Sequence, residues 1–409
     1  MRIAAVIWSI LIAISANSQG FYVVRDTVSL SPSSDFLIGF DTDFNGLTIQ
    51  SEGALDWSGI QVIVGNAQGG FDTLYPQQDE HLEKVQSNLL MFKKQRYFSI
   101  LSATKVDLVL VFQYVEPLDN PLPKSLIKRS LCNEPSAIIM QSEWRQGLDA
   151  PIPGRVSTPT KHCIVHHSAG GNGQTDYTQL VRSYYVQHTQ VNGWDDIGYN
   201  YLIASDGRIY AGRDPEKQEI SQDQVLGAHF CAKNTGTMGV CLIGDYTSVT
   251  PSNAMMSALE HLLTWKMAKD TLSPFGKYNH PNPQGELLDA IAGHRQGCAT
   301  ECPGSQVYNR LATLRNVVYS HYVNCLPFVS LKNEIQTVTS LIYPNPSLKE
   351  VFISNEYFSE ISEIQIYNSL GFLVSNRLSQ VYNLPAGIYF FKIAFIGGDT
   401  YNQKMIVQE

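Results

Sequence analysis

The distribution of apolar and polar residues divides the chain into three regions, and the first has the pattern of β-strands. Short apolar or alternating runs, such as 36–38, 60–64 and 106–112, are separated by clusters of Gly, Asp, Asn and Ser. Runs of this length bounded by turn-forming residues are typical of strands. We therefore predict an all-β N-terminal domain over residues 19–128, with a small β-sandwich as its expected fold.

The middle region, residues 130–326, mixes helical and strand periodicities. Apolar residues recur at helical spacing over 177–190 and 254–268. Residues 198–203 and 238–244 are predicted strands, and the second is apolar throughout, which is typical of a strand buried on both faces. This alternation predicts a central α/β domain with a mixed β-sheet flanked by helices.

The last region, residues 341–409, returns to a β pattern after a predicted linker over 327–340. Residues 364–367 and 388–393 are predicted strands separated by turn-forming segments. The region is about 70 residues long and has no His and no Cys. We expect a small β-sandwich that carries no chemistry, and hence a multidomain protein.

The first 18 residues have the pattern of a signal peptide. A short positive start is followed by a mostly apolar run, and Ala16-Asn17-Ser18 offers small residues for cleavage after Ser18. The alternative is a membrane anchor, but the apolar run is about a dozen residues, whereas a spanning helix needs about 20. With no other long apolar stretch, we expect an exported protein without a transmembrane segment.

Composition excludes one class of partner and supports a globular fold. Hydrophobic residues make up 44% of the chain and charged residues 16%, which is ample material for buried cores. The net charge is −8, and no basic run occurs. Because binding to phosphates needs a basic surface, we expect no nucleic-acid partner.

The cysteines all lie in the middle region and are odd in number. They are Cys132, Cys163, Cys231, Cys241, Cys298, Cys302 and Cys325. Export permits disulfides, and Cys132 and Cys325 could join the two ends of the region. Cys163 and Cys241 lie in apolar runs, where buried free thiols are equally consistent with the pattern. An odd count leaves at least one thiol unpaired, and a metal thiolate would account for it.

Two separate segments together offer the ligands of a catalytic zinc site. The loop 293–304 is rich in glycine and places His294 and Cys302 eight positions apart. About 130 residues upstream, the predicted strand 164–169 carries two adjacent histidines. Because neighbouring residues of a strand face opposite ways, one of the two can join the site. Two histidines and one cysteine, with a fourth position left for water, form a known type of catalytic zinc site.

The middle region resembles the peptidoglycan-recognition protein and N-acetylmuramoyl-L-alanine amidase family over nearly all of residues 132–320. The matching motifs occur in the family's order, namely Ser142-Glu143-Trp144-Arg145, residues 164–169, 193–203 and 206–213, Gly227-Ala228-His229, and the loop 293–304. The resemblance implies that His166, His294 and Cys302 bind one Zn²⁺. It implies a structural role for His167 on the opposite face of the strand.

The resemblance also implies a reaction, which is hydrolysis of the amide between N-acetylmuramic acid and L-alanine of peptidoglycan. Tyr199 would assist the zinc-bound water or the transition state. Thr300 stands where the family has Lys or Thr, and would donate a hydrogen bond to the developing oxyanion. His229, Trp194 and Arg213 would contact the substrate, with aromatic packing as the alternative for Trp194.

The same family contains receptors that bind peptidoglycan without cleaving it. Receptors without activity commonly carry Ser at the third ligand position, whereas this chain has Cys302, so the resemblance favours an enzyme over a non-catalytic binding protein. The segment 170–173 lacks the cysteine pair found in many animal members. Asp214-Pro215 follows Arg213 where some members have Gly-Trp, a pair tied to recognition of diaminopimelate. The stem-peptide preference therefore stays open.

The last region resembles the C-terminal sorting domain of the type IX secretion system of certain Gram-negative bacteria. The resemblance rests on Tyr343-Pro344-Asn345-Pro346-Ser347, residues 384–389 and the terminal segment 404–407. It implies recognition by the type IX machinery, passage across the outer membrane and removal of the tail. The alternative to a sorting domain is a glycan-binding domain. The alternative to secretion is a periplasmic location of the protein.

The expected partners are peptidoglycan or muropeptides, and we expect a monomer. For the N-terminal domain two roles stay open, namely an aid to wall binding and a folding or inhibitory segment.

Overall fold

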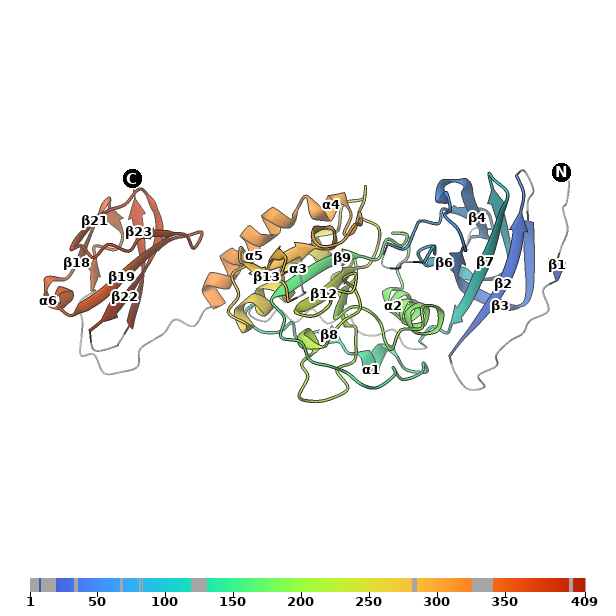
Figure 1. The fold of residues 1–409 in the computed structure, drawn as a ribbon, viewed down its shortest axis with the longest axis horizontal. Helices are drawn as coiled ribbons and strands as arrows, with labels where there is room; N and C mark the ends of the chain where they lie inside the picture. The colour runs from blue at the N-terminus through green and yellow to red at the C-terminus, as the bar shows by residue number, and fades with distance from the viewer. Residues whose placement is uncertain are drawn as a thin grey trace. The chain divides into compact units, whose positions relative to one another are not determined.

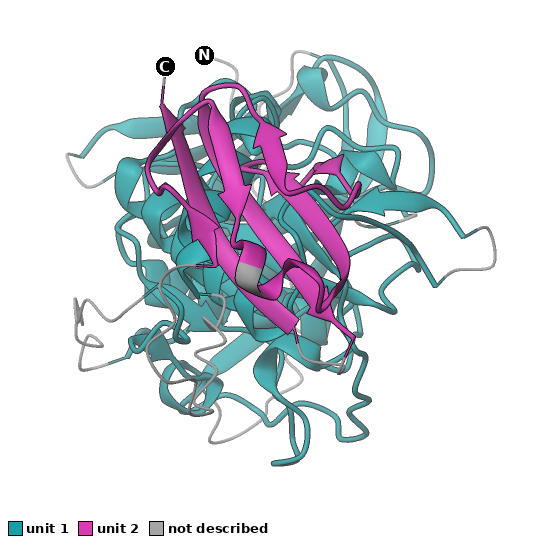
Figure 2. Ribbon diagram, turned by 90° about the vertical axis from the view of Figure 1, so that its left-hand side faces the viewer, with its two compact units in different colours: residues 1–326 teal, residues 327–409 magenta. Residues whose placement is uncertain are grey.

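A computed structural model describes residues 7–8, 20–32, 36–66, 69–80, 82, 84–118, 131–281, 285–325, 341–396 and 400–408. The chain forms two compact units, residues 1–326 and residues 327–409 (Figures 1 and 2). The predicted signal peptide lies outside the described residues except for Ile7–Trp8, which form strand β1. The predicted linker 327–340 lies outside them entirely.

The N-terminal domain is all-β, as predicted, but its described strands form one sheet instead of two stacked ones. The order is β2-β7-β3-β6-β4-β5, with β1 paired to β3. The register of β3 against β6 shifts on both sides of Phe44. Such irregularities bend a strand, and β3 pairs with β6 and with β7. The strands are β2 Phe21–Leu30, β3 Phe36–Gln50, β4 Ile60–Gly65, β5 Phe71–Leu74, β6 Leu90–Ser102 and β7 Val106–Val115.

The central domain is built on a mixed six-stranded sheet, as predicted. The strand order is β15-β9-β12-β10-β11-β8, and the β10–β11 pair is antiparallel while the other pairs are parallel. Every residue of β9 and β12 is buried. The strands are β8 Ile138–Ile139, β9 His162–His167, β10 Tyr201–Ile203, β11 Ile209–Ala211, β12 Thr237–Leu242 and β15 Ile291–Gly293, and a separate pair is β13 Lys277–Asn279 with β14 Leu287–Asp289.

Helices cover both faces of this sheet, and the two predicted helices are confirmed. Helices α3 (Asn253–Lys269) and α5 (Leu311–Cys325) share one apolar core with Cys163 and Val165 of β9. Helix α2 (Tyr177–Val186), continued by a π-helical turn over Gln187–Val191, packs on the other face. Short helices are α1 Gln141–Trp144 and α4 Ser305–Tyr308. None of the helices in the described residues is long and apolar enough to cross a membrane.

The C-terminal unit contains two sheets that share one apolar core. The three-stranded sheet has the order β16-β18-β21, and the five-stranded sheet β17-β23-β22-β19-β20 (Figure 2). The predicted strands within 361–368 and 387–395 are confirmed. The elements are β16 Ile342–Tyr343, β17 Ser347–Leu348, β18 Glu350–Ile353, α6 Asn355–Phe358, β19 Ile361–Asn368, β20 Leu373–Ser375, β21 Val381–Asn383, β22 Gly387–Phe395 and β23 Thr400–Gln408.

Two disulfides lie in the central domain. Cys132 pairs with Cys325 and joins the two ends of the domain, which is the pairing that the sequence left possible. Cys231 pairs with Cys298, and this bond ties the loop after His229 to the loop that carries Cys302. The predicted buried thiols Cys163 and Cys241 are both free, and burial raises the pKa of Cys163 to about 12.

Candidate metal centre

His166, His294 and Cys302 meet at one end of the central sheet. Strands β9 and β15 run parallel with Val165 opposite Gly293, so that His166 near the end of β9 lies beside His294, the first residue after β15. The ligand atoms of the two histidines and of Cys302 all lie within 4.8 Å of one another, and all three side chains are buried. Ligand sites of open α/β sheets lie at this carboxyl end of parallel strands.

The spacing of the donor atoms fits a tetrahedral zinc ion. The Sγ of Cys302 lies 3.7 Å from Nδ1 of His166. Ordinary zinc–sulfur and zinc–nitrogen bond lengths in a tetrahedron separate these two atoms by about 3.6 Å. The backbone N–H of His167 donates to the same sulfur over 3.3 Å, a contact that favours the thiolate form. The three residues therefore fit a zinc site with a fourth position for water.

A chain of hydrogen bonds behind His166 sets the orientation of its ring. Nε2 of His166 lies 3.0 Å from Nδ1 of His229, and Nε2 of His229 lies 3.3 Å from Oγ1 of Thr237. The Thr237 hydroxyl donates to the carbonyl oxygen of Asn234 over 2.7 Å. Because a carbonyl oxygen only accepts, the Thr237 hydroxyl uses its proton on Asn234 and accepts from Nε2–H of His229. Nδ1 of His229 is then the acceptor for Nε2–H of His166. This leaves the Nδ1 lone pair of His166 facing Cys302.

His229 therefore has a different place from the one predicted. A place in the substrate groove was expected for His229, whereas the structure buries it behind His166 with 3% of its surface exposed. Partners of this kind hold a metal-binding histidine in one tautomer and one ring orientation. We infer that His229 supports the metal site and does not line the groove.

Replacing His229 with Phe is expected to weaken zinc binding by roughly 10- to 100-fold, because the ring of His166 loses the acceptor that orients it. Competition with a chromophoric chelator measures this affinity. The control is His261→Ala, since His261 lies on α3 and contacts the carbonyl oxygen of Asn133. A His229→Phe protein that binds zinc as tightly as the His261→Ala protein would contradict the inferred role.

Tyr199 lies beside the three candidate ligands. Its ring centroid is 5.3 Å from that of His166, and its hydroxyl shares a hydrogen bond with the thiol of Cys241. Burial raises the pKa of Tyr199 well above its ordinary value, so the hydroxyl stays protonated and able to donate. The preceding residue has to be glycine, because a Cβ atom at Gly198 would lie 2.5 Å from the carbonyl oxygen of Ala228.

Thr300 is held between the candidate ligand and the N-terminal domain. Its Oγ1 accepts a hydrogen bond from the backbone N–H of Cys302 over 3.0 Å. The same hydroxyl donates to the carboxylate of Glu80, which also accepts the N–H of Glu301 over 2.8 Å. Glu80 is a site residue that the sequence analysis did not identify. It lies 220 positions from Thr300, in a segment with no recognisable motif.

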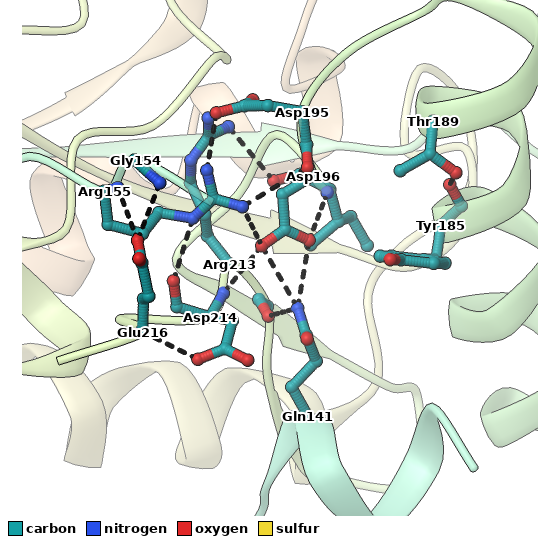
Figure 3. A network of polar contacts seen from close by, with 12 residues as sticks. Gln141, Gly154, Arg155, Tyr185, Thr189, Asp195, Asp196, Arg213, Asp214 and Glu216 are labelled. Carbon is teal, nitrogen blue, oxygen red and sulfur yellow. Dashed lines mark hydrogen bonds and ion pairs between the residues drawn. The ribbon is translucent and has the colours of Figure 1, made fainter. Parts of the chain in front are cut away.

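A buried polar network orders the loop that leads to Tyr199 (Figure 3). Asp195 pairs with both Arg155 and Arg213. The carboxylate of Asp196, which is fully buried, accepts from Arg155 over 3.1 Å and from the N–H of Asp214 over 2.8 Å. Burial raises the pKa of Asp196 to about 6.

Arg213 and Trp194 are the two remaining residues predicted to contact the substrate. Arg213 is 6% exposed and bonds to Asp195 and to the carbonyl oxygen of Ile197, so its guanidinium is occupied within the network of Figure 3. Trp194 is half-buried and packs on His188 with ring centroids 4.6 Å apart. The packing alternative for Trp194 thus matches the structure.

Comparisons with known proteins identify the family of the central domain and of the C-terminal unit. The family model for N-acetylmuramoyl-L-alanine amidase matches residues 156–305, and that for the secretion system C-terminal sorting domain matches residues 341–408. Peptidoglycan-recognition protein SC2 of Drosophila melanogaster is 31% identical over 183 residues, which cover 44% of this chain and 86% of that protein. N-acetylmuramoyl-L-alanine amidase of Sus scrofa is 32% identical over 184 residues, covering 43% of this chain and 27% of that protein.

A solved structure, wild-type Drosophila PGRP-LB, is 28% identical with a TM-score of 0.34, and the match covers 43% of this chain and 92% of that chain. The match over 341–408 confirms the predicted sorting domain and indicates export by type IX secretion to the cell surface or the surroundings. The matches over the central domain cover the strands and loops that carry the candidate ligands. The chain belongs to the N-acetylmuramoyl-L-alanine amidase and peptidoglycan-recognition protein family.

Proposed function

We propose that the protein is a zinc-dependent N-acetylmuramoyl-L-alanine amidase. It would cleave the amide between the lactyl group of N-acetylmuramic acid and L-alanine of the stem peptide. The observation that carries the proposal is the buried cluster of His166, His294 and Cys302 beside Tyr199, within a domain of the amidase family. One zinc ion per chain is the implied cofactor.

The surrounding residues suit amide hydrolysis. Zinc, when bound, supplies a Lewis acid and a water molecule whose pKa is lowered to about 7. His229 orients the ring of His166, and the N–H of His167 stabilises the Cys302 thiolate. The protonated hydroxyl of Tyr199, once released from the Cys241 thiol, would stabilise the oxyanion of the tetrahedral intermediate. Thr300 would add a second donor once its hydroxyl is released from Glu80.

A binding protein without activity is the second candidate, because several relatives are named peptidoglycan-recognition proteins. Presence of a thiolate ligand at Cys302 favours the enzyme, since a structure that only binds peptidoglycan has no need of an activated water. The sorting domain supports export to the cell surface or the surroundings, so we propose foreign or environmental peptidoglycan as the target. Turnover of the cell's own wall is the alternative.

Digestion of a defined muropeptide separates the two candidates. The full-length protein is incubated at high concentration with N-acetylmuramoyl-L-alanyl-D-isoglutamine, and the products are identified by mass. Free N-acetylmuramic acid together with the dipeptide is the expected result, and a chelator should abolish it until zinc is added back. Substrate that binds but is recovered intact would overturn the amidase and favour the receptor.

A further inference from the structure

A segment of the N-terminal domain lies directly over the candidate metal centre. Gln78, Asp79 and Glu80 line the cavity beside Cys302 and Tyr199, and its volume is about 30 Å³. This is the space of roughly one water molecule. Pockets that bind small organic ligands have volumes of about 300–1,000 Å³. While residues 78–80 stay in place, the cavity therefore leaves too little room for a muropeptide, and cleavage by the wild-type protein should be slow.

The central domain contacts the covering residues 78–80 and, again, the chain that follows them. Glu80 accepts hydrogen bonds from Thr300 and from the N–H of Glu301. Further along, the side chain of Asn88 donates to the carbonyl oxygen of Ala169 over 2.6 Å, immediately after the histidine strand. The side chain of Gln86, which is fully buried, donates to Asn192 over 2.9 Å. The chain is thus bonded to the central domain at Glu80 and again at Gln86 and Asn88.

The contact with Glu80 also occupies the donor that the reaction would need. The Thr300 hydroxyl has one proton, and this proton points to the Glu80 carboxylate. While that bond persists, Thr300 cannot donate to an oxyanion formed at the metal centre. The N-terminal domain therefore hinders the proposed site in two ways. Residues 78–80 narrow the cavity beside Cys302, and Glu80 engages the hydroxyl of Thr300.

We propose that the N-terminal domain keeps the hydrolase latent, with residues 78–80 covering the metal centre until they are displaced. This inference rests on the proposed amidase function. Of the roles that the sequence left open for the N-terminal domain, the proposal is the inhibitory one. An enzyme that cleaves peptidoglycan and is exported past the cell's own wall would benefit from such a cover, because the cover would protect that wall during passage.

Residues 78–80 can be displaced without separating the whole N-terminal domain from the central domain, because other residues hold the two domains together. Arg182 of α2 is 1% exposed and donates to the carbonyl oxygen of Glu116 over 2.8 Å, and Gln179 donates to that of Val115 over 2.6 Å. Phe21 and Leu89 belong to the same apolar cluster as α2. Deleting the domain would expose this face and could unfold the protein, so the test uses point variants of the covering segment.

The test compares the full-length protein with Glu80→Ala in two assays. The first measures alkylation of Cys302 by N-ethylmaleimide in metal-free protein, with Cys163 and Cys241 as buried reference thiols in the same sample. The second measures cleavage of N-acetylmuramoyl-L-alanyl-D-isoglutamine by zinc-loaded protein. Loss of Glu80 removes a charge-assisted contact with two donors, so we expect both rates to rise roughly tenfold. The reference thiols should react unchanged.

Two further variants complete the test. Asp107→Ala removes an exposed carboxylate that bonds Ser29 in the same domain, and it should change neither rate. A variant with Gln78→Gly, Asp79→Gly and Glu80→Gly clears the side chains from the cavity and should raise both rates further than Glu80→Ala.

The outcomes separate latency from the proposed function. A joint rise in alkylation and cleavage supports latency. If the wild-type protein cleaves as fast as both segment variants, and Cys302 reacts equally in all of them, latency is overturned and the amidase stands. Faster alkylation without cleavage by any variant overturns the amidase, and with it the latency of that activity, although the segment would still be shown to cover the site.

Discussion

Replacing Cys302 with serine is expected to abolish both zinc retention and amidase turnover. A neutral hydroxyl is a much poorer zinc ligand than a thiolate, and the remaining two histidines cannot complete a stable site. Cys302 is 1% exposed, and Ser has nearly the same volume, so the fold should persist. We expect turnover to fall roughly 10³-fold or more, since both the activated water and the Lewis acid are lost.

The measurement pairs zinc content by elemental analysis with muropeptide cleavage. The matched control is Cys163→Ala, a buried cysteine of the same domain whose side chain faces helices α3 and α5 instead of the metal centre. This control should keep one zinc per chain and wild-type turnover. A Cys302→Ser protein that retained stoichiometric zinc and activity would refute the assignment of the third ligand, whatever the behaviour of the control.

Much of the central domain could be predicted because its signals are local. An uninterrupted apolar run indicated β12, and helical spacing indicated α2 and α3. The alternation of a strand also separated His166 from His167, and the structure places only His166 in the cluster with His294 and Cys302. The two histidines meet because the parallel strands β9 and β15 are neighbours, a pairing that the sequence did not reveal.

Contacts that depend on register or on domain docking could not be predicted. His229 reaches His166 because of how the segment before β12 returns beside β9, and no spacing rule specifies that return. Arg213 is drawn into a network by Asp195, which lies 18 positions away on another loop. Glu80 meets Thr300 only because the N-terminal sheet docks on α2. A periodic pattern carries no information about such docking.

The N-terminal sheet illustrates the same limit at the level of a domain. Its strands were predicted from alternating and apolar runs, and β3, β4 and β7 are confirmed. Their arrangement in one sheet depends on register shifts within β3 near Phe44. Those shifts let β3 pair with β6 and with β7, and alternation alone does not reveal where a strand bends.

Tyr199→Phe is expected to lower kcat by about 10²- to 10³-fold while leaving zinc content unchanged. This is the usual cost of removing one donor from an oxyanion site. The substitution keeps the ring that packs beside His166 and removes only the hydroxyl. Because the affected hydrogen bond would strengthen as the oxyanion forms, kcat and kcat/KM should fall together and KM should change little.

Tyr201→Phe provides the control, since Tyr201 lies in the core with α3 and α5, whereas Tyr199 belongs to the cluster with α2 on the other face of the sheet. Its side chain is fully buried, and its hydroxyl has no hydrogen-bond partner among the described residues. Loss of that hydroxyl should be neutral or slightly stabilising. If both variants lost the same activity, the effect would come from disturbed packing of the strand. If only Tyr199→Phe did, with zinc retained, the hydroxyl itself would be assigned to the transition state. If Tyr199→Phe kept full activity, stabilisation of the oxyanion would have to come from the metal and Thr300 alone.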